Sequence, residues 1–416
     1  RDDEDKNITI RNNLVADVGR VGVRLTTFVY EADVGPSGIR GGQSGLVQDN
    51  VIDGAILAGI EMFSVDTVVE RNTIRNIGLL AELTADGLGC ELTGNNCAIH
   101  GNGVRLAVDN EVWSGHDNTL RLNRLEQIGW TGIDVRGPFN LIEHNVIVEP
   151  SVTLAEGAGI RTYDGNNFSI TRAHDLTVSE NVILDPVGEY HGMPPPRDRL
   201  WGYGINIDYS DAVEVTGNTV RGATAYGLIF TFARGSATGN TLWDNTNGPS
   251  GVAHLRLLDT SPNSTTRVAL NGNAIYARLA NRPLLSIEVL AHVTAADNNY
   301  YFNPFDNRLV RVSAISPIAM SLSSWQSTSG HDASSRETWF TLLGGQPDPS
   351  VLFVNDTDTP LNVPLAEPHF DLDQNVVAGS FTLDPFASRI LIGGANVVFI
   401  DGFETGDTSQ WTETVP

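Results

Sequence analysis

The sequence has little basic charge and no long apolar run, and each shortage excludes a class of protein. Lysine and arginine number 26 against 50 aspartate and glutamate residues, which gives a formal net charge of -24. Such an acidic chain is a poor partner for nucleic acid or for an anionic membrane. No apolar stretch approaches the roughly 20 residues that a membrane-spanning helix needs. We therefore expect no nucleic-acid partner and no membrane span, and the acidic clusters leave room for Ca²⁺.

Cysteine is also scarce. The two present, Cys90 and Cys97, lie close together in a stretch rich in Gly and Asn. This spacing predicts a local disulfide and hence an oxidising compartment, whereas a metal site would need more ligands nearby. We expect a secreted bacterial protein, extracellular or at the cell surface. No signal peptide is visible, because residues 1–6 run almost directly into a repeat, so we expect a chain trimmed at its N-terminus.

A repeat dominates the rest of the sequence. Asn recurs two residues before Ile, Val or Leu, and three of the gaps are 22 residues long, as from Asn50 to Asn72. A recurring period with loop-sized additions is typical of a solenoid. Asn suits turns and can bond from one repeat to the next, so the series predicts a structural role. Its members are Asn50, Asn72, Asn123, Asn145, Asn181, Asn218, Asn240 and Asn273, with Asn13 as a weaker start.

A second motif runs out of phase with the first. It is Gly followed by an aliphatic, a variable and usually another aliphatic residue, as in Gly132-Ile133-Asp134-Val135. Alternation with period two predicts a strand with one buried face. A unit of 22 residues is too short for a βαβ crossover, which takes roughly 30 residues. Each unit therefore predicts one turn of a coil of strands, whose inward aliphatic side chains stack into a continuous core.

This pattern resembles the right-handed parallel β-helix proteins over roughly residues 6–312. The superfamily includes pectate lyase-like, carbohydrate-active secreted bacterial proteins. The resemblance implies an all-β fold, but one such fold hosts many chemistries. After the coil, strand-like runs at 351–354 and 380–392 predict a small β-rich module. The expected domains are a parallel β-helix over 1–314, a β-rich capping module over 315–395 and an acidic tail over 396–416.

The glycine motif also predicts which side chains share a face. If the aliphatic residue after Gly points inward, the next residue points outward, and successive turns stack these outward residues in a row. Insertions interrupt the repeat beside these strands, which predicts loops along one sheet and hence a groove. The outward row is Arg24, Glu61, Arg105, Asp134, Arg161, Asn206 and Ile229, and the next row includes Phe63, Arg136, Tyr163, Asp208 and Thr231.

Arginine beside carboxylate on this face predicts a site for a uronate-bearing polysaccharide, because the guanidinium binds carboxylates with two parallel hydrogen bonds. A lyase needs its substrate carboxylate neutralised, a base for the C5 proton and an acid for the leaving oxygen. The expected catalytic residues are Arg161 and Tyr163, as base and acid, together with Asp134. Expected substrate ligands are Arg105, Arg136, Asn206 and Trp201, and possible Ca²⁺ ligands are Glu61, Asp134 and Asp208.

Two other functions remain open from the sequence. An inverting glycoside hydrolase would use Asp134 and Asp208, which lie two turns and roughly 10 Å apart by the strand spacing. A non-enzymatic scaffold, such as an adhesin or a filament subunit, could stack end to end through an uncapped first turn. Motifs diagnostic of polygalacturonases and uronan epimerases are absent. The polysaccharide lyase is therefore the leading hypothesis.

Overall fold

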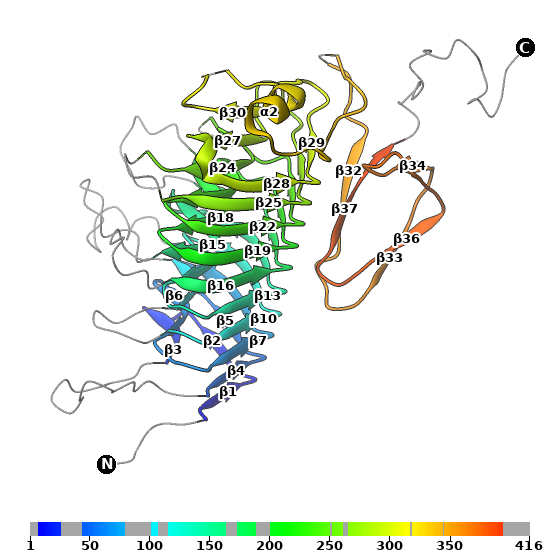
Figure 1. The fold of residues 1–416 in the computed structure, drawn as a ribbon. Coiled ribbons are helices and arrows are strands. Elements are labelled where there is room, and N and C mark those ends of the chain that lie inside the picture. Colours follow the sequence, from blue (N-terminus) through cyan, green and yellow to red (C-terminus); the bar gives the residue numbers. More distant parts are fainter. Residues whose placement is uncertain are drawn as a thin grey trace, which may run out of the picture.

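The computed structural model describes residues 7–25, 44–79, 101–106, 115–163, 173–188, 200–249, 252–260, 265–316, 318–343 and 345–393. Short strands wind around one axis into a long coil, and a small antiparallel unit lies beside it (Figure 1). The predicted parallel β-helix, followed by a β-rich module, is therefore confirmed. None of the described helices is both long enough and apolar enough to span a membrane.

Three parallel sheets run along the coil, and each turn contributes one strand to each sheet. Sheet A consists of β1 (Thr9–Arg11), β4 (Leu46–Gln48), β7 (Val68–Glu70), β10 (Thr119–Arg121), β13 (Leu141–Glu143), β16 (His174–Ser179), β19 (Asp211–Thr216), β22 (Arg234–Thr238), β25 (Arg267–Asn271) and β28 (Val293–Asp297). Sheet B consists of β2 (Leu14–Ala16), β5 (Val51–Asp53), β8 (Thr73–Ile77), β11 (Arg124–Ile128), β14 (Val146–Pro150), β17 (Val182–Leu184), β20 (Thr219–Arg221), β23 (Thr241–Trp243), β26 (Ala274–Tyr276), β29 (Tyr300–Phe302) and β31 (Arg336–Glu337). Sheet C consists of β3 (Val21–Leu25), β6 (Ala58–Met62), β9 (Asn102–Leu106), β12 (Ile133–Val135), β15 (Gly157–Tyr163), β18 (Gly202–Asp208), β21 (Tyr226–Thr231), β24 (Leu255–Leu258), β27 (Leu285–Ile287) and β30 (Val310–Val312).

The repeated asparagines form a ladder at the turn between sheets A and B. Asn145 donates from its backbone N–H and from Nδ2 to Oδ1 of Asn181, at 3.0 Å in both cases. The same pair of bonds links each predicted member to the next, from Asn13 onward. The ladder also continues from Asn273 to Asn299, which the sequence pattern missed because Tyr301, and not an aliphatic residue, follows two positions later. The predicted structural role is therefore confirmed.

The recurrent glycine is required by close approach. A Cβ at Gly103 would lie 2.5 Å from Cδ2 of Leu125 and 2.6 Å from the carbonyl oxygen of Gly132 on the next turn. Any side chain there would push adjacent turns apart or displace a core leucine. Glycine at this position therefore lets sheet C lie against the aliphatic side chains that sheet B contributes to the core.

The last turn is closed by residues that the sequence assigned to the C-terminal module. Trp325 in α2 (Leu322–Ser329) is fully buried in the coil's core, and β31 pairs with β29 as an additional strand of sheet B. Buried Asp332 accepts hydrogen bonds from Asn299, Trp325 and Tyr301, and so ends the asparagine ladder. Residues within the range predicted as a capping module, 315–395, therefore cover the end of the coil, because α2 supplies the apolar cover that the final turn needs.

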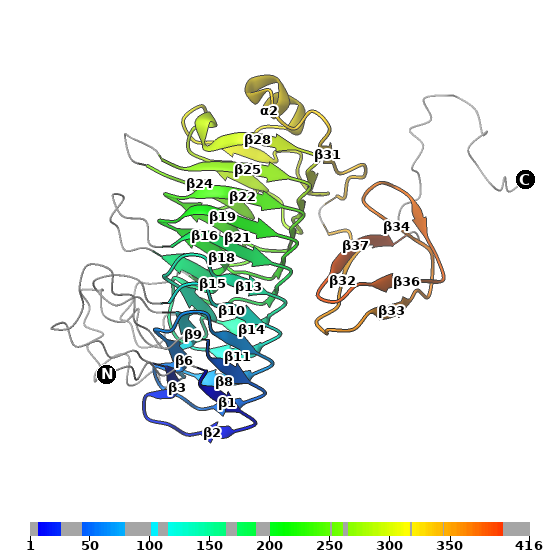
Figure 2. The same cartoon turned by 60° about the horizontal axis from the view of Figure 1, so that its bottom comes forward.

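A small antiparallel unit follows. Its strands are β32 (Ser350–Val354), β33 (Leu361–Pro364), β34 (His369–Phe370), β35 (Val376–Val377), β36 (Ser380–Leu383) and β37 (Ser388–Gly393). It lies against the side of the coil rather than its end (Figure 2). Ile390 and Ile392 cluster there with Trp243 and Tyr276 of sheet B. The predicted tail over 396–416 lies outside the described residues.

Candidate functional site

The outward face of sheet C carries the predicted row of polar residues. Strand register places Glu61 between Arg24 and Arg105, Asp134 between Arg105 and Arg161, and Asn206 beside Arg161. The predicted stacking is therefore confirmed. We call the following set the arginine face: Arg24, Glu61, Arg105, Asp134, Arg136, Arg161, Tyr163, Asn206 and Asp208.

At one end of the arginine face, Glu61 is held by two arginines. Its Oε2 lies 2.9 Å from Nε of Arg24, and its Oε1 lies 2.9 Å from Nη1 of Arg105. The Glu61 side chain is only 10% exposed. Both carboxylate oxygens of Glu61 are therefore engaged in ion pairs at this end of the arginine face.

Asp134 lies at the middle of the face with its side chain fully buried. Its Oδ2 accepts from Nε of Arg136 at 3.0 Å and lies 4.0 Å from Nε of Arg105. Its Oδ1 has no hydrogen-bond partner. One oxygen of this buried carboxylate is thus held in place while the other is free to accept a hydrogen bond.

Arg161, Tyr163 and Asp208 form the next group along the axis. Nη2 of Arg161 donates to Oδ2 of Asp208 at 3.1 Å, and the guanidinium carbon lies 4.5 Å from the ring centre of Tyr163. The ring of Trp130 lies on the guanidinium as well, at 5.3 Å. Tyr163 and Asp208 are direct register partners on β15 and β18, about 4.8 Å apart by the strand spacing. The group therefore places an acid, an arginine and a phenol side by side.

Asp208 and Arg161 differ in how their surroundings change their protonation. Burial raises the pKa of Asp208 to about 6, although the neighbouring Arg161 opposes that rise. Burial disfavours the charge of Arg161, but Asp208 and Asp134 outweigh it and raise its pKa above the ordinary value. Asp208 can therefore exchange a proton near neutral pH, whereas Arg161 stays protonated.

A raised carboxyl pKa does not by itself mark a site. Burial also raises the pKa of Asp244 to about 6, yet Asp244 lies near Arg278 and Asp348, where the antiparallel unit meets the coil. The arginine face has a further property, a group of buried polar atoms without partners. These are Nε of Arg105, Oδ1 of Asp134, Nε of Arg161, Oδ1 of Asn206 and Oδ1 of Asp208. Such atoms are costly unless a ligand or water satisfies them, so they point to a binding site.

The predicted calcium ligands do not gather into a metal centre in this structure. Glu61, Asp134 and Asp208 lie on β6, β12 and β18, so other strands separate them, and each is paired with arginine. No group of three or more His, Cys, Asp or Glu side chains within the described ranges is placed to hold a metal ion. Calcium binding stays a prediction.

The role of Trp201 as a substrate ligand stays a prediction. Trp201 precedes β18 and Asp208 ends it, so the two are about 23 Å apart along an extended strand. Trp130 is in contact with Arg161. The sequence signal for it was slight: Trp130 stands two residues before the glycine of the β12 motif. Cys90 and Cys97 lie outside the described residues, and their disulfide stays a prediction.

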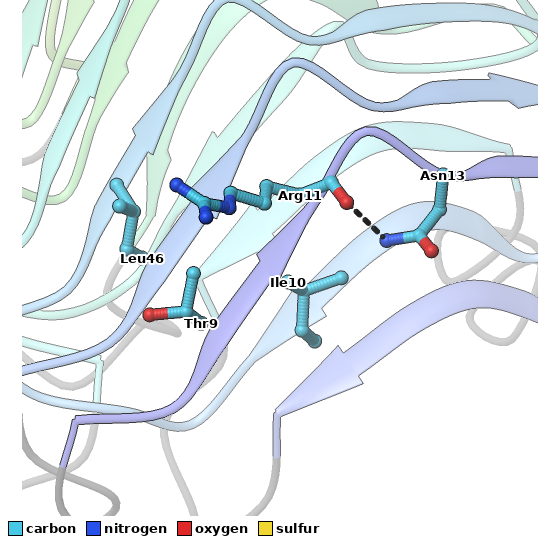
Figure 3. A pocket seen from close by; sticks show the side chains of 5 residues that line it. All are labelled: Thr9, Ile10, Arg11, Asn13 and Leu46. Atoms are coloured by element: carbon cyan, nitrogen blue, oxygen red, sulfur yellow. Dashed lines mark hydrogen bonds between the residues drawn. The ribbon is translucent and has the colours of Figure 1, made fainter.

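A depression also lies at the first turn, away from the arginine face. Thr9, Ile10, Arg11, Asn13 and Leu46 line it (Figure 3), and it encloses about 620 Å³. None of the predicted catalytic or binding residues is among these five. End-to-end association through this turn stays a prediction.

Comparison with known proteins points to the same fold. The family model described as "Right handed beta helix region" matches residues 3–183. No curated protein matches the sequence.

Among solved structures, an alginate lyase from Paenibacillus sp. str. FPU-7 is 11% identical, with a TM-score of 0.41 over 74% of this chain and 98% of that one. A PL6 alginate lyase in complex with a trisaccharide is 14% identical, with a TM-score of 0.35 over 68% of this chain and 58% of that one. The Dettilon tailspike protein is 13% identical, with a TM-score of 0.35 over 91% of this chain and 68% of that one. At these identities and TM-scores the likenesses carry no argument about activity.

The fold itself rests on the chain's own features. The family model covers the first turns, and the asparagine ladder and the parallel strand pairing continue from there to the last turn. The chain therefore folds as a right-handed parallel β-helix.

Proposed function

We propose that the protein is a polysaccharide lyase that acts on a uronate-containing polymer at the arginine face. The observation that carries this proposal is the charge of that face. It holds four arginines and three carboxylates, in a chain whose formal net charge is -24. A cationic excess on one sheet of an acidic protein favours an anionic ligand, and the unpartnered buried atoms supply further hydrogen-bonding groups.

The pKa values change the roles expected from the sequence. Arg161 stays protonated, which makes it unsuitable as the base but suitable for holding the substrate carboxylate. Asp208 is the better base, since its Oδ2 is held by Arg161 while Oδ1 is unpartnered. Tyr163, its register partner, keeps the role of acid.

These roles give a balanced β-elimination. Oδ1 of Asp208 takes the C5 proton, and the C5–H electrons form the C4=C5 double bond. The C4–O bond breaks, and the leaving oxygen receives the phenolic proton of Tyr163. Arg161, with Arg105 and Arg136 nearby, stabilises the negative charge that develops on the uronate carboxylate. Proton exchange with water then restores Asp208 and Tyr163.

One observation favours a second function, an inverting glycoside hydrolase. An Asp208 with a pKa of about 6 could serve as the protonated acid, with Asp134 as the base that activates water. Asp134 and Asp208 are two strands apart, or about 10 Å, slightly more than the ~6.5–9.5 Å typical of inverting pairs. We therefore rank the hydrolase second.

The test is turnover of polygalacturonate, alginate and glycosaminoglycans, each with Ca²⁺ and with a chelator. A lyase releases unsaturated uronates that absorb in the ultraviolet, whereas a hydrolase releases reducing ends without that absorbance. Asp208→Asn should lower the rate about 1000-fold, because general base catalysis contributes roughly 10²–10⁴-fold and Asn keeps the shape needed to bond Arg161.

Two results would contradict the lyase. Reducing ends without ultraviolet absorbance would favour the hydrolase. Polymers that bind without being cut would favour a non-enzymatic binding protein. A normal rate in Asp208→Asn would mean that another residue acts as the base.

A further inference from the structure

The outward row on sheet C resumes beyond the arginine face. After Ile229 on β21, strand register places Arg256 on β24, Ser286 on β27 and Arg311 on β30 in the same row. The sequence pattern ended at Ile229 because the glycine motif does not recur in β24, β27 or β30. We call Tyr226, Arg256, Ser286, Glu288 and Arg311 the distal cluster.

Arg256 contacts two other members of the distal cluster, Tyr226 and Glu288. Its guanidinium carbon lies 5.3 Å from the ring centre of Tyr226, and Nη1 donates to the Tyr226 hydroxyl. Nη2 lies 3.3 Å from Oε1 of Glu288. Nε is buried without a hydrogen-bond partner, and the side chain as a whole is only 18% exposed. The guanidinium is therefore held in place with one of its donors unused.

Arg311 lacks a carboxylate of its own. Its Nε and Nη2 both donate to Oγ of Ser286, at 3.2 and 3.0 Å. No carboxylate in the described part of the chain forms an ion pair with it. Burial and the charge of Arg256 lower the pKa of Arg311, which means that its charge is poorly compensated where it stands. The distal cluster therefore holds two arginines and one carboxylate, that of Glu288, and carries an excess positive charge.

The distal cluster lies on the same face as Arg161 but is separated from it by an apolar step. Arg256 is three strands beyond Arg161, or about 14 Å along the axis. Buried Ile229 lies between them, packed with Tyr203 and Tyr226, whose ring centres are 5.4 Å apart. An extended sugar chain that follows the axis from Arg161 would pass these rings, on which sugar faces can stack, before reaching Arg256.

We propose that Arg256 and Arg311 form a second anion-binding subsite, which holds an acidic sugar unit several residues away from the unit at Arg161. The proposal rests on the proposed function, since it assumes that an anionic polymer lies along sheet C. With a second anion-binding subsite at this separation, the affinity for a polymer depends on its length and on whether it carries a second acidic unit. Short oligomers bound at Arg161 would not reach it.

The test measures binding without turnover. In the Asp208→Asn background, oligogalacturonates and alginate oligomers of graded length are titrated by calorimetry, with dextran oligomers as the neutral counterpart. Arg311→Gln should weaken the binding of long acidic oligomers about tenfold and leave the binding of short ones unchanged. Arg256→Lys, which keeps the charge but not the planar group, should give a smaller loss. Arg308→Gln is the matched control, because it removes an exposed arginine paired with Asp306 near the same end of the coil.

The outcomes separate this proposal from the proposed function. Three results would overturn the second subsite. The first is an equal loss of affinity for oligomers of all lengths, and the second is the same loss in Arg308→Gln. The third is no loss of affinity in either Arg311→Gln or Arg256→Lys. If long acidic oligomers bind in a way that depends on Arg311 but the wild-type protein does not cut them, the second subsite is supported and the lyase is rejected. Circular dichroism of each variant confirms that the coil is intact.

Discussion

The asparagine ladder and the arginine face run along the same coil with the same spacing, but they treat hydrogen bonds differently. Each buried asparagine repeats one residue type, and its Oδ1 receives two bonds from the turn before it. The arginine face alternates charge and leaves buried atoms such as Oδ1 of Asp134 and Oδ1 of Asp208 without partners. A stack that satisfies every group supports the fold, whereas a stack that leaves groups open can bind a ligand.

A third stack shows that charge alone is not the distinction. On the outer side of sheet B, Arg75 pairs with Asp53 one turn away at 2.9 Å, with 47% of the arginine side chain exposed. Water satisfies such exposed groups, so this pair needs no ligand. What separates the arginine face from it is burial combined with unpartnered atoms.

The largest effect should come from breaking the asparagine ladder. Asn145→Ala removes a buried amide whose Nδ2 also donates to the carbonyl oxygens of Leu120 and Glu143. Leaving these partners unsatisfied should lower the free energy of unfolding by about 3 kcal/mol, measured by urea denaturation. Asn271→Ala, at an exposed position, is the control and should change little. Equal losses in both variants would contradict the role assigned to the ladder.

A smaller effect is expected in the pH dependence of the arginine face. With Asp208 as the base, the rate should fall about tenfold for each pH unit below pH 6 and level off above it. If Asp208 is instead the acid of a hydrolase, the rate should fall above pH 6. A profile without an inflection near pH 6 would remove Asp208 from both mechanisms.

The same pKa sets the sign of its effect on stability. The folded-state pKa of Asp208 is above its ordinary value of 3.8, so the folded protein binds more protons between these values. The contribution of Asp208 to stability is therefore greatest at low pH and declines as the pH rises from about 4 to about 6. Asp208→Asn should flatten this part of a curve of unfolding midpoint against pH.

The smallest effect should come from the exposed pair on sheet B. Arg75→Ala should lower the free energy of unfolding by about 0.5 kcal/mol, because exposed ion pairs contribute little, and the rate of polymer cleavage should be unchanged. Cleavage assays alongside Arg161→Ala make the comparison direct. A similar loss of activity in both variants would mean that general surface charge, and not the arginine face, binds the polymer.

Much of the arginine face could be predicted because side chains in a stacked coil follow from register. The glycine motif placed Glu61 beside Arg105 and Asp134 beside Arg161, and the strand pairs agree. The contact of Trp130 with Arg161 could not be predicted, because Trp130 lies outside the repeated motif. The arginines of the distal cluster were missed for a related reason: β24 and β30, on which they lie, lack the glycine motif and are recognisable only from pairing with their neighbours.

The sequence by itself determined the coil, the asparagine ladder and the row of outward residues, because a period repeated along a chain specifies which residues stack. Only the tertiary structure decided which stacked groups are buried, which oxygens are held and which are open. It also decided that α2 closes the last turn and that the antiparallel unit lies beside sheet B. Burial and pairing depend on atoms brought together from distant parts of the chain. The pKa of Asp208, and the chemistry proposed for it, therefore cannot be predicted from the repeat alone.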